Sequence, residues 1–325
     1  MSIQTKNDKL LPVGGIIRRL PYVIIFKTTN YCWFRCAHCC ESAGPDQPRE
    51  YMPLDIIYTY LCEAVKDPLY SGHAVFTGGE IMSSYKFGDP KYVPTILKWC
   101  LQANIRTDIK TNAGWARTSF GKQIFDDLAD VITTYPDNRL QISLSLDNFH
   151  TNCMENNLHV LERLAGDKLK VAINMPLFND SAQMFPELLN RLRARGVRVE
   201  ELMMLNPKTM DATPVTLLNQ SVLVQHNCTT LFDGGRAKNL PQASHTEFPQ
   251  FKFMDASGMY YMAFDTRGRV TLGENSGRKI STRWKLPFTN KIYCMAAIKD
   301  ALIRDARYEE LRAMLFHGWK RVQAY

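Results

Sequence analysis

Four of the nine cysteines of this 325-residue chain fall in one short segment, YCWFRCAHCC, at residues 31–40. Cys32, Cys36 and Cys39 have the spacing CxxxCxxC, and they follow closely after YVIIF, residues 22–26, an apolar run typical of a strand. A loop at a strand end can point three thiolates at one position, and thiolates are ligands of zinc and of iron–sulfur clusters. The spacing therefore predicts a metal centre at this strand end.

The number of ligands separates the two kinds of metal centre. A structural zinc site closes with four Cys or His ligands, whereas a four-iron cluster held by three thiolates keeps one iron open. His38 and Cys40 are available as a fourth zinc ligand, so a zinc- or RNA-binding module is the alternative from another class. That alternative accounts for nothing further along the chain.

The sequence around this segment alternates between strand-like and helix-like stretches. Apolar runs of strand character lie at residues 22–26, 73–76, 107–111, 140–146, 169–175 and 199–205. Helical periodicity lies between them, at residues 54–66, 92–103, 120–132, 157–165 and 182–195. Strands joined by helical crossovers pair in parallel, so we predict an α/β fold, as an open doubly wound sheet or as a full or partial barrel. In both cases the functional loops follow the carboxyl ends of the strands.

The cysteine spacing resembles CxxxCxΦC of the radical S-adenosylmethionine (radical SAM) superfamily, in which Φ is usually aromatic and is His38 here. In that family the cysteines follow the first strand of a partial (β/α)6 barrel. The resemblance implies that Cys32, Cys36 and Cys39 hold one 4Fe-4S cluster and that S-adenosylmethionine (SAM) chelates its open iron. It also implies reductive cleavage of SAM to a 5′-deoxyadenosyl radical, hydrogen abstraction from a substrate C–H bond, and flavodoxin or ferredoxin as the reductant.

A second motif, FTGGE at residues 76–80, ends the second predicted strand and is similar to the GGE motif of the same family. Glycine lets a backbone approach a ligand closely, and Glu80 or nearby carbonyls can accept hydrogen bonds from an ammonium group. By resemblance this group is the amino group of SAM, and Thr77, Gly78, Gly79 and Glu80 become cofactor-binding candidates.

Polar residues also end the next strands. Thr111 and Asn112 follow the third strand, and Ser145 and Asp147 resemble the pair that contacts the ribose and carboxylate of SAM. The alternative is that Ser145 only alternates with buried leucines and that Asp147 caps the next helix. Asn174 and Asn206 are further candidates, for which an ordinary polar strand end is the alternative.

After about Pro207 the alternation stops, and GMYYMAFDTRGRVTLGE, residues 258–274, predicts a β-hairpin. The hairpin and a predicted helix at 296–316 are similar to the extension of SPASM or twitch enzymes, whose cysteines hold auxiliary clusters. Gly273 and Glu274 stand at the corresponding place here. We therefore predict an N-terminal segment at 1–21, a core barrel at 22–207 and a degenerate extension at 208–325.

The remaining cysteines allow several roles. Cys62 and Cys100 lie on apolar helical stripes and are expected to be buried. A single auxiliary cluster on Cys153, Cys228 and Cys294 is one alternative, with oxidation or crosslinking as its chemistry. Cys228 also resembles the thiol with which some radical SAM epimerases return a hydrogen atom to the substrate; Cys153 is a second candidate, and a buried thiol is the alternative for both.

Composition limits the partners. The net charge of +8 is dispersed, which argues against a nucleic-acid partner, and the sequence contains no membrane span or signal peptide, so a cytoplasmic protein is expected. Few residues precede the first strand, so no leader-binding domain is expected there. We expect maturation of a ribosomal peptide or synthesis of a small natural product. Redox-neutral epimerisation or rearrangement is favoured because auxiliary-cluster ligands are missing.

Overall fold

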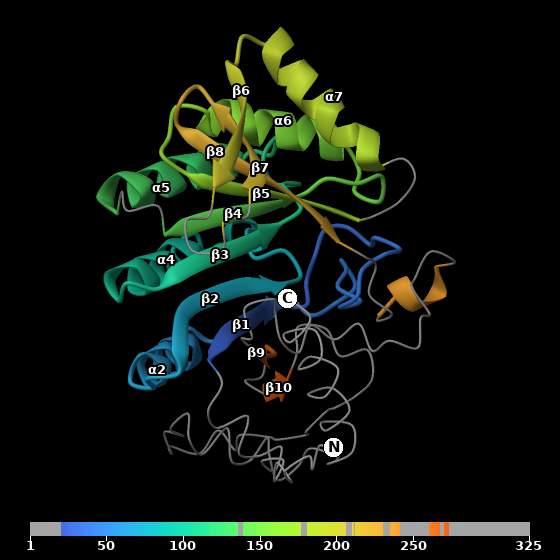
Figure 1. Cartoon of the computed structure of the whole chain (residues 1–325). Coiled ribbons are helices and arrows are strands. Elements are labelled where there is room, and N and C mark those ends of the chain that lie inside the picture. Colours follow the sequence, from blue (N-terminus) through green and yellow to red (C-terminus); the bar gives the residue numbers. More distant parts are fainter. Residues whose placement is uncertain are drawn as a thin grey trace, which may run out of the picture.

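The computed structural model describes residues 21–135, 139–176, 181–205, 210, 212–229, 235–240, 260–266 and 270–272. Within them, one sheet of ten strands has the order β10-β9-β1-β2-β3-β4-β5-β8-β7-β6 (Figure 1). The strands are β1 (Tyr22–Thr29), β2 (Tyr70–Gly78), β3 (Arg106–Thr111), β4 (Leu140–Ser145), β5 (Lys170–Pro176), β6 (Val199–Leu205), β7 (Ala212–Leu218), β8 (Val222–Thr229), β9 (Tyr260–Phe264) and β10 (Val270–Leu272). The helices are α2 (Leu54–Val65), α3 (Ser83–Lys86), α4 (Tyr92–Gln102), α5 (Gly121–Thr134), α6 (Cys153–Leu164), α7 (Ser181–Ala194) and the short 3-10 helix η1 (Ala237–Asn239).

The centre of the sheet is parallel, as the alternation predicts. Strands β1 to β5 pair in chain order, and helices α2, α4, α5 and α6 form the crossovers between them. Each crossover helix turns its apolar face inward; on α2 this face is Ile57, Tyr60, Leu61 and Ala64, at helical spacing. The mixed α/β fold and the five predicted helices are therefore confirmed.

The prediction that residues 199–205 form a sixth parallel strand is wrong. Residues 199–205 form β6, which lies at the edge of the sheet and pairs antiparallel with β7, while β8 takes the parallel place beside β5. In β8, alternate residues such as Val222 and Val224 are buried in the core, which suits this strand to the position beside β5. In β6, by contrast, Met203 and Leu205 are exposed. The sheet therefore continues past residue 207.

The predicted hairpin at 258–274 is present in its described part, since β9 and β10 pair antiparallel. Strand β9 also pairs in parallel with β1, from Tyr22 opposite Tyr260 to Phe26 opposite Phe264, and so extends the core sheet. The predicted helix at 296–316 and the segment 1–20 lie outside the described residues, as do Asn206, Gly273, Glu274 and Cys294.

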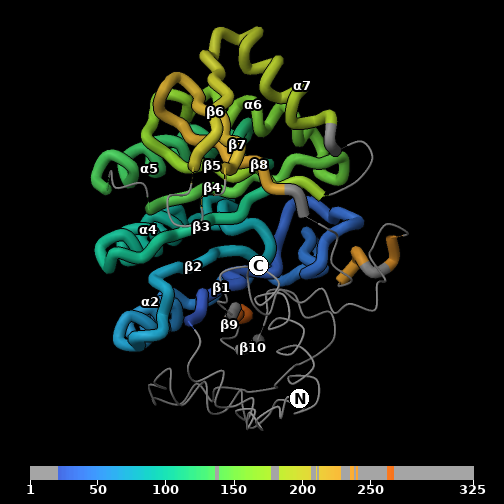
Figure 2. Tube along the Cα trace, in the orientation of Figure 1, coloured from blue at the N-terminus to red at the C-terminus, as the bar shows by residue number. Residues whose placement is uncertain are grey.

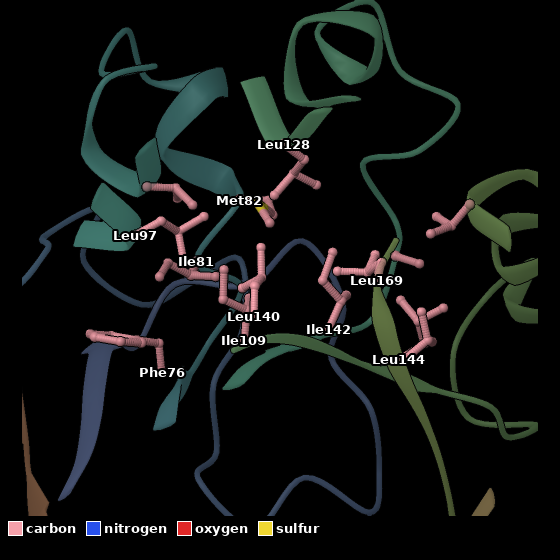
Figure 3. Close-up of a cluster of buried hydrophobic side chains, with 14 of the residues drawn as sticks. Phe76, Ile81, Met82, Leu97, Ile109, Leu128, Leu140, Ile142, Leu144 and Leu169 are labelled. Atoms are coloured by element: carbon pink, nitrogen blue, oxygen red, sulfur yellow. The ribbon is translucent and has the colours of Figure 1, made fainter. Parts of the chain in front are cut away.

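The main core lies between the sheet and the crossover helices. Phe26 stacks on Phe76 and on Phe264, with ring centroids 5.2 and 5.5 Å apart, and Figure 3 shows the core continuing through Ile109 and Leu144. Figure 2 traces helices α2, α4 and α5 along one side of the sheet. Among the described helices, none combines the length and the hydropathy that a membrane crossing requires.

The other face of the sheet becomes polar away from β1. Near β1 it carries a small apolar cluster that includes Val23 and Val75. On β3 and β4 it carries buried polar groups, and Ser143 Oγ donates to Asp108 Oδ1 at 2.6 Å. Buried polar side chains of this kind are stable because they are hydrogen-bonded to one another.

Candidate functional site

The cysteine segment forms the loop after β1, at the carboxyl end of that strand. Cys32 and Cys36 are buried, and Cys39 is half-buried. Burial raises the pKa of Cys32 to about 12, and the charges of Glu80 and of an ionised Cys39 add to this rise. Burial also raises the pKa of Cys36 to about 12, with further contributions that include Cys32 and Cys39. The three cysteines thus share one loop at a strand end, which fits a cluster held by three thiolates.

Arg236, which the sequence analysis missed, fastens this loop from a distant part of the chain. Its Nε donates to the Cys36 carbonyl oxygen at 3.0 Å, its Nη2 to the Ala43 carbonyl oxygen at 2.6 Å, and its backbone N–H to the Cys39 carbonyl oxygen at 2.9 Å. Its charge also acts to lower the pKa of Cys36, against the larger effect of burial. The neighbouring Gly235 has φ +52°, and a Cβ there would overlap the carbonyl oxygens of this loop.

The two glycines of FTGGE allow β2 to end directly against the end of β1. A Cβ on Gly79 would overlap the carbonyl oxygen of Tyr31, and Gly78 has φ +109° with the position of a Cβ only 2.6 Å from the Thr29 carbonyl oxygen. Gly79 N–H donates to that same Thr29 oxygen at 2.6 Å. Thr77, just before them, pairs with Lys27 of β1. The close backbone approach predicted for a ligand is therefore made here by the chain itself.

Glu80 joins the ends of β2 and β3. Its fully buried carboxylate accepts hydrogen bonds from Thr111 Oγ1 at 2.9 Å, Asn112 N–H at 3.0 Å and Met82 N–H at 3.1 Å. Burial raises the pKa of Glu80 to about 7, although these donors favour its charged form. The side chain thus holds Thr111 and Asn112 in place through bonds that already occupy its oxygens.

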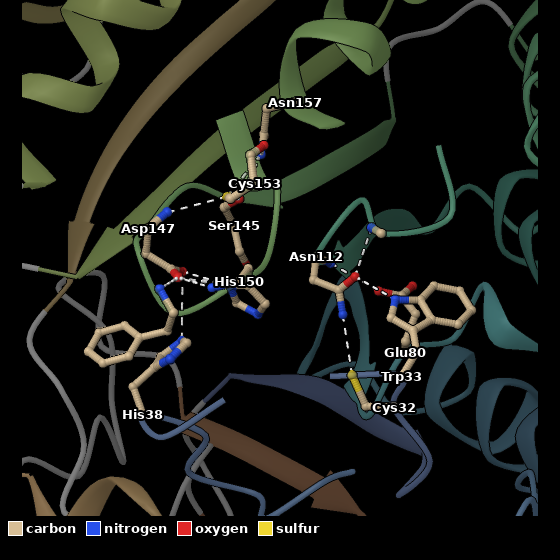
Figure 4. Close-up of polar contacts among 12 residues, drawn as sticks. Cys32, Trp33, His38, Glu80, Asn112, Ser145, Asp147, His150, Cys153 and Asn157 are labelled. Atoms are coloured by element: carbon tan, nitrogen blue, oxygen red, sulfur yellow. Dashed lines mark hydrogen bonds and ion pairs between the residues drawn. The ribbon is translucent and has the colours of Figure 1, made fainter. Parts of the chain in front are cut away.

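Asn112 connects the end of β3 to the cysteine loop (Figure 4). Its Nδ2 donates to Cys32 Sγ at 3.3 Å, while its Oδ1 accepts from Trp33 Nε1 at 3.1 Å and from Gly114 N–H at 2.9 Å. A side chain at Gly114 would overlap the Trp33 ring. The structure therefore brings Asn112 directly onto one of the predicted cluster ligands.

At the end of β4, the side chain of Cys153 is hydrogen-bonded to the backbone of Ser145. Cys153 Sγ donates to the Ser145 carbonyl oxygen at 3.0 Å, and Asn157 Nδ2 donates to the same oxygen at 2.9 Å. Cys153 is buried at the start of α6, and burial raises the pKa of its thiol to about 12. These contacts give Cys153 a structural bond to β4.

Asp147 closes the turn that precedes α6. It is 2% exposed, and its Oδ1 accepts from Phe149 N–H at 2.8 Å and from His150 N–H at 3.1 Å. His150, which the sequence analysis also missed, places Nδ1 at 2.9 Å from both carboxylate oxygens. Burial raises the pKa of Asp147, but the bonds and charges of His150 and His38 outweigh it and hold the pKa below its ordinary value.

His38 meets this group from the cysteine loop. Its ring packs on Phe149 with centroids 4.5 Å apart and on His150 at 5.1 Å, and its Nε2 lies 3.7 Å from Asp147 Oδ2. Burial lowers the pKa of His38 to about 4, so the ring is neutral. These contacts use the ring and Nε2, whereas the buried Nδ1 of His38 has no hydrogen-bond partner among the described residues. The contacts therefore do not decide whether His38 serves as a fourth zinc ligand.

The other predicted residues lie further along the sheet. Asn174 on β5 pairs with Ser145 of β4, and its Oδ1 accepts from Asn227 Nδ2 at 3.2 Å. The backbone of Cys228 lies in β8, opposite Met175 of β5. Cys100 is fully buried, as predicted, whereas Cys62 is half-buried.

Comparisons with known proteins find a likeness in structure only. No family model and no curated protein sequence matches the chain. It is similar to Streptococcus suis SuiB bound to S-adenosylmethionine (12% identity, TM-score 0.37, 86% of this chain and 68% of SuiB) and to SuiB bound to the precursor peptide SuiA (12%, 0.42, 86% and 67%). It is also similar to anSMEcpe with bound AdoMet (12%, 0.38, 54% and 48%).

The likeness is remote at this identity and TM-score. The case for a function therefore comes from the residues of this chain.

Proposed function

We propose that this chain is a radical SAM enzyme in which Cys32, Cys36 and Cys39 hold one 4Fe-4S cluster. The observation that carries the proposal is that the loop with these three cysteines is held from two sides, by Asn112 at Cys32 and by Arg236 at Cys36 and Cys39. A loop braced in this way can present three thiolates without rearrangement. A zinc module gives no reason for the bracing from β3 and from residue 236.

The architecture assigned to this function is a partial barrel. Strands β1 to β5 and β8 are six neighbouring parallel strands, and we assign them to the (β/α)6 core. The extension, predicted to begin at residue 208, then begins after β8. Thr111 and Ser145 end β3 and β4, and Asn174, near the end of β5, pairs with Ser145. Loops at this end of the strands bind ligands in such folds.

When bound, the cluster and SAM supply a 5′-deoxyadenosyl radical by one-electron reductive cleavage, with an electron from flavodoxin or ferredoxin. The chain's part is to bind and orient SAM and the substrate and to exclude water from the site. This is needed because a carbon radical reacts with whatever hydrogen it meets first. Since internal donors occupy the Glu80 carboxylate, and Thr28 Oγ1 donates to the Thr77 carbonyl oxygen at 3.3 Å, we assign the backbone carbonyls of Gly78 and Gly79 to the SAM ammonium group. We also assign His38 to the cofactor site, on the β4 side, because its ring packs on Phe149 and His150.

For the reaction we propose hydrogen abstraction from a ribosomal peptide or a small natural product, with a redox-neutral epimerisation or rearrangement as the outcome. Cys228 is the hydrogen-donor candidate that we retain first, because the thiol of Cys153 already donates to the Ser145 carbonyl oxygen. The same bond weakens the alternative in which Cys153 ligates one auxiliary cluster for oxidation or crosslinking.

Anaerobic reconstitution tests the cluster and the SAM chemistry together. We expect about four irons per chain, and 5′-deoxyadenosine when SAM and dithionite, or a reduced flavodoxin, are added. Cys36→Ala should abolish both results, and Cys40→Ala, on the same loop, should retain them. Stoichiometric zinc without SAM cleavage would overturn the proposal in favour of a zinc module, and about eight irons would reinstate the auxiliary cluster.

A further inference from the structure

The side-chain amide of Asn112 is held in one orientation. Its Oδ1 accepts from Trp33 Nε1 at 3.1 Å and from Gly114 N–H at 2.9 Å. Both partners are donors only, so the atom that meets them must be the amide oxygen. The NH2 group is therefore the part of the amide that meets Cys32, with Nδ2 3.3 Å from Sγ, and Figure 4 shows this contact as a dashed line that ends on the sulfur.

The backbone around Asn112 fixes the position of this side chain. Asn112 N–H donates to Glu80 Oε2 at 3.0 Å, which ties the end of β3 to the end of β2. Ala113 has a left-handed φ of 58°, and this turn brings Gly114 N–H back to Asn112 Oδ1. A Cβ at Gly114 would overlap Trp33 Nε1, so glycine leaves the space that the indole needs. The donor toward the sulfur is thus placed by hydrogen bonds that do not involve the sulfur.

The contact between Asn112 and Cys32 lies inside the protein. Asn112 is 7% exposed and Cys32 is 8% exposed. Water therefore competes little for either group, and a hydrogen bond in such a setting is electrostatically stronger than in water. In the proposed function Cys32 is a thiolate ligand, so an amide N–H aimed at its sulfur favours the state in which that sulfur carries more negative charge.

We infer that Asn112 raises the reduction potential of the proposed cluster through the hydrogen bond from Nδ2 to Cys32 Sγ. The inference rests on the proposed function and adds to it a residue that eases the electron-transfer step. In that step flavodoxin or ferredoxin is oxidised by one electron and the cluster is reduced by one, while no bond forms or breaks. The added negative charge spreads onto the ligand sulfurs, so a donor to Cys32 stabilises the reduced state more than the oxidised state.

A purely structural role is the competing explanation, because the same hydrogen bond also holds the cysteine loop. Two variants separate the explanations. Asn112→Ser keeps a side-chain oxygen for Gly114 N–H, since serine forms the same kind of turn as asparagine, but its hydroxyl is too short to reach Cys32. Asn112→Leu has a similar size and loses every side-chain hydrogen bond. An electrostatic role predicts the same shift in potential for both variants, because each lacks the donor, whereas a structural role predicts a shift for Asn112→Leu alone.

The test is an anaerobic redox titration of the reconstituted protein without SAM, with the iron content measured beside it. We expect both Asn112 variants to hold wild-type iron. At a fixed solution potential their ratio of reduced to oxidised cluster should fall about tenfold below wild type, the effect of one hydrogen bond to a charged group, which is about 59 mV for one electron. Trp115→Phe is the matched control, because it removes the hydrogen bond from Trp115 Nε1 to the neighbouring Thr111 Oγ1 and leaves Asn112 in place. It should keep the wild-type potential.

Pulsed EPR of the reduced cluster detects the contact itself. Wild type whose asparagine amides carry heavy nitrogen should show a nitrogen coupled to the cluster, and Asn112→Ser should not. The inference is overturned if wild type shows no such coupling, if both Asn112 variants keep the wild-type potential, or if Asn112→Leu alone shifts it. It is also overturned if Trp115→Phe shifts the potential equally, or if both Asn112 variants lose the cluster. Wild type that holds about four irons and cleaves SAM keeps the proposed function in each of these cases, whereas wild type that holds no cluster overturns both.

Discussion

Arg236 donates from Nε to the carbonyl oxygen of Cys36 at 3.0 Å, across 200 residues of sequence. The same guanidinium donates to the carbonyl oxygen of Ala43, so one side chain ties together two points of the loop that carries the cysteines. Hydrogen bonds from a charged donor are stronger than neutral ones. The geometry of the cysteine loop therefore depends on a residue beyond the parallel strands.

Arg236→Met should loosen the cysteine loop and lower iron retention. The substitution leaves the carbonyl oxygens of Cys36 and Ala43 without their donor, at a cost of about 1–3 kcal/mol for each buried group. We expect faster loss of iron to a chelator after reconstitution. Arg35→Met is the control, because Arg35 lies on the same loop but is exposed, and its ion pair among the described residues is with Asp46. Equal rates of iron loss in the two variants would contradict the role of Arg236.

Gly79→Ala should destabilise the whole fold. Its Cβ would overlap the backbone carbonyl of Tyr31, which cannot move without separating β1 from β2. Overpacking against backbone should cost at least about 3 kcal/mol of unfolding free energy. Gly166→Ala is the matched control, since no atom of the described part of the chain lies within 4 Å of the position of its Cβ. Urea denaturation measures both variants, and a similar midpoint for the two would refute this account of the glycine pair.

The sequence predicted the cysteine loop and the parallel strands because their signals are local. The spacing of Cys32, Cys36 and Cys39 and the apolar runs before each helix can be read without knowledge of the tertiary structure. The place beside β5 could not be predicted in this way. The prediction takes residues 199–205 as the sixth strand and ends the alternation at about residue 207, so it misses β7 and β8. Which strand pairs with β5 is decided by the whole sheet.

The turn between β7 and β8 explains part of this error. Asn219 and Gln220 have φ of 46° and 63°, as in a tight hairpin, but without the glycine that usually announces such a turn. Arg236 left no signal because its partners are distant in sequence. His150 did leave one, since an aspartate at a strand end followed three residues later by a histidine allows the two side chains to meet in a turn.

Glu80 should make the stability of the protein depend on pH. Its pKa is raised from 4.5 to about 7 in the folded protein, chiefly by burial. Between these pH values the folded protein holds a proton that the unfolded chain has released, so stability falls as pH rises through this window. The loss amounts to about 3 kcal/mol at 1.36 kcal/mol per pKa unit.

Glu80→Gln removes the titrating group and should remove this slope. Urea denaturation of wild type and variant across the window measures the difference in unfolding free energy at each pH. We expect the unfolding free energy of wild type to fall relative to that of Glu80→Gln as pH rises. Glu187→Gln, at an exposed position on α7, is the control. Its unfolding free energy should depend on pH in the same way as that of wild type. Parallel curves for Glu80→Gln would contradict the raised pKa.

Cys228 and Cys153 should differ in their effect on the reaction. If Cys228 returns a hydrogen atom to the substrate radical, the thiyl radical left on its sulfur must take one electron from the flavodoxin or ferredoxin and one proton from solvent. Cys228→Ala will then still form 5′-deoxyadenosine but will lose the product, because a methyl group cannot donate that hydrogen. Cys153→Ser keeps a donor toward the Ser145 carbonyl oxygen and should leave product formation unchanged. Deuterium from heavy water should enter the wild-type product through the exchangeable thiol of Cys228. The same product at the same rate from Cys228→Ala would remove Cys228 from the mechanism, and loss of product in Cys153→Ser alone would assign the donor role to Cys153.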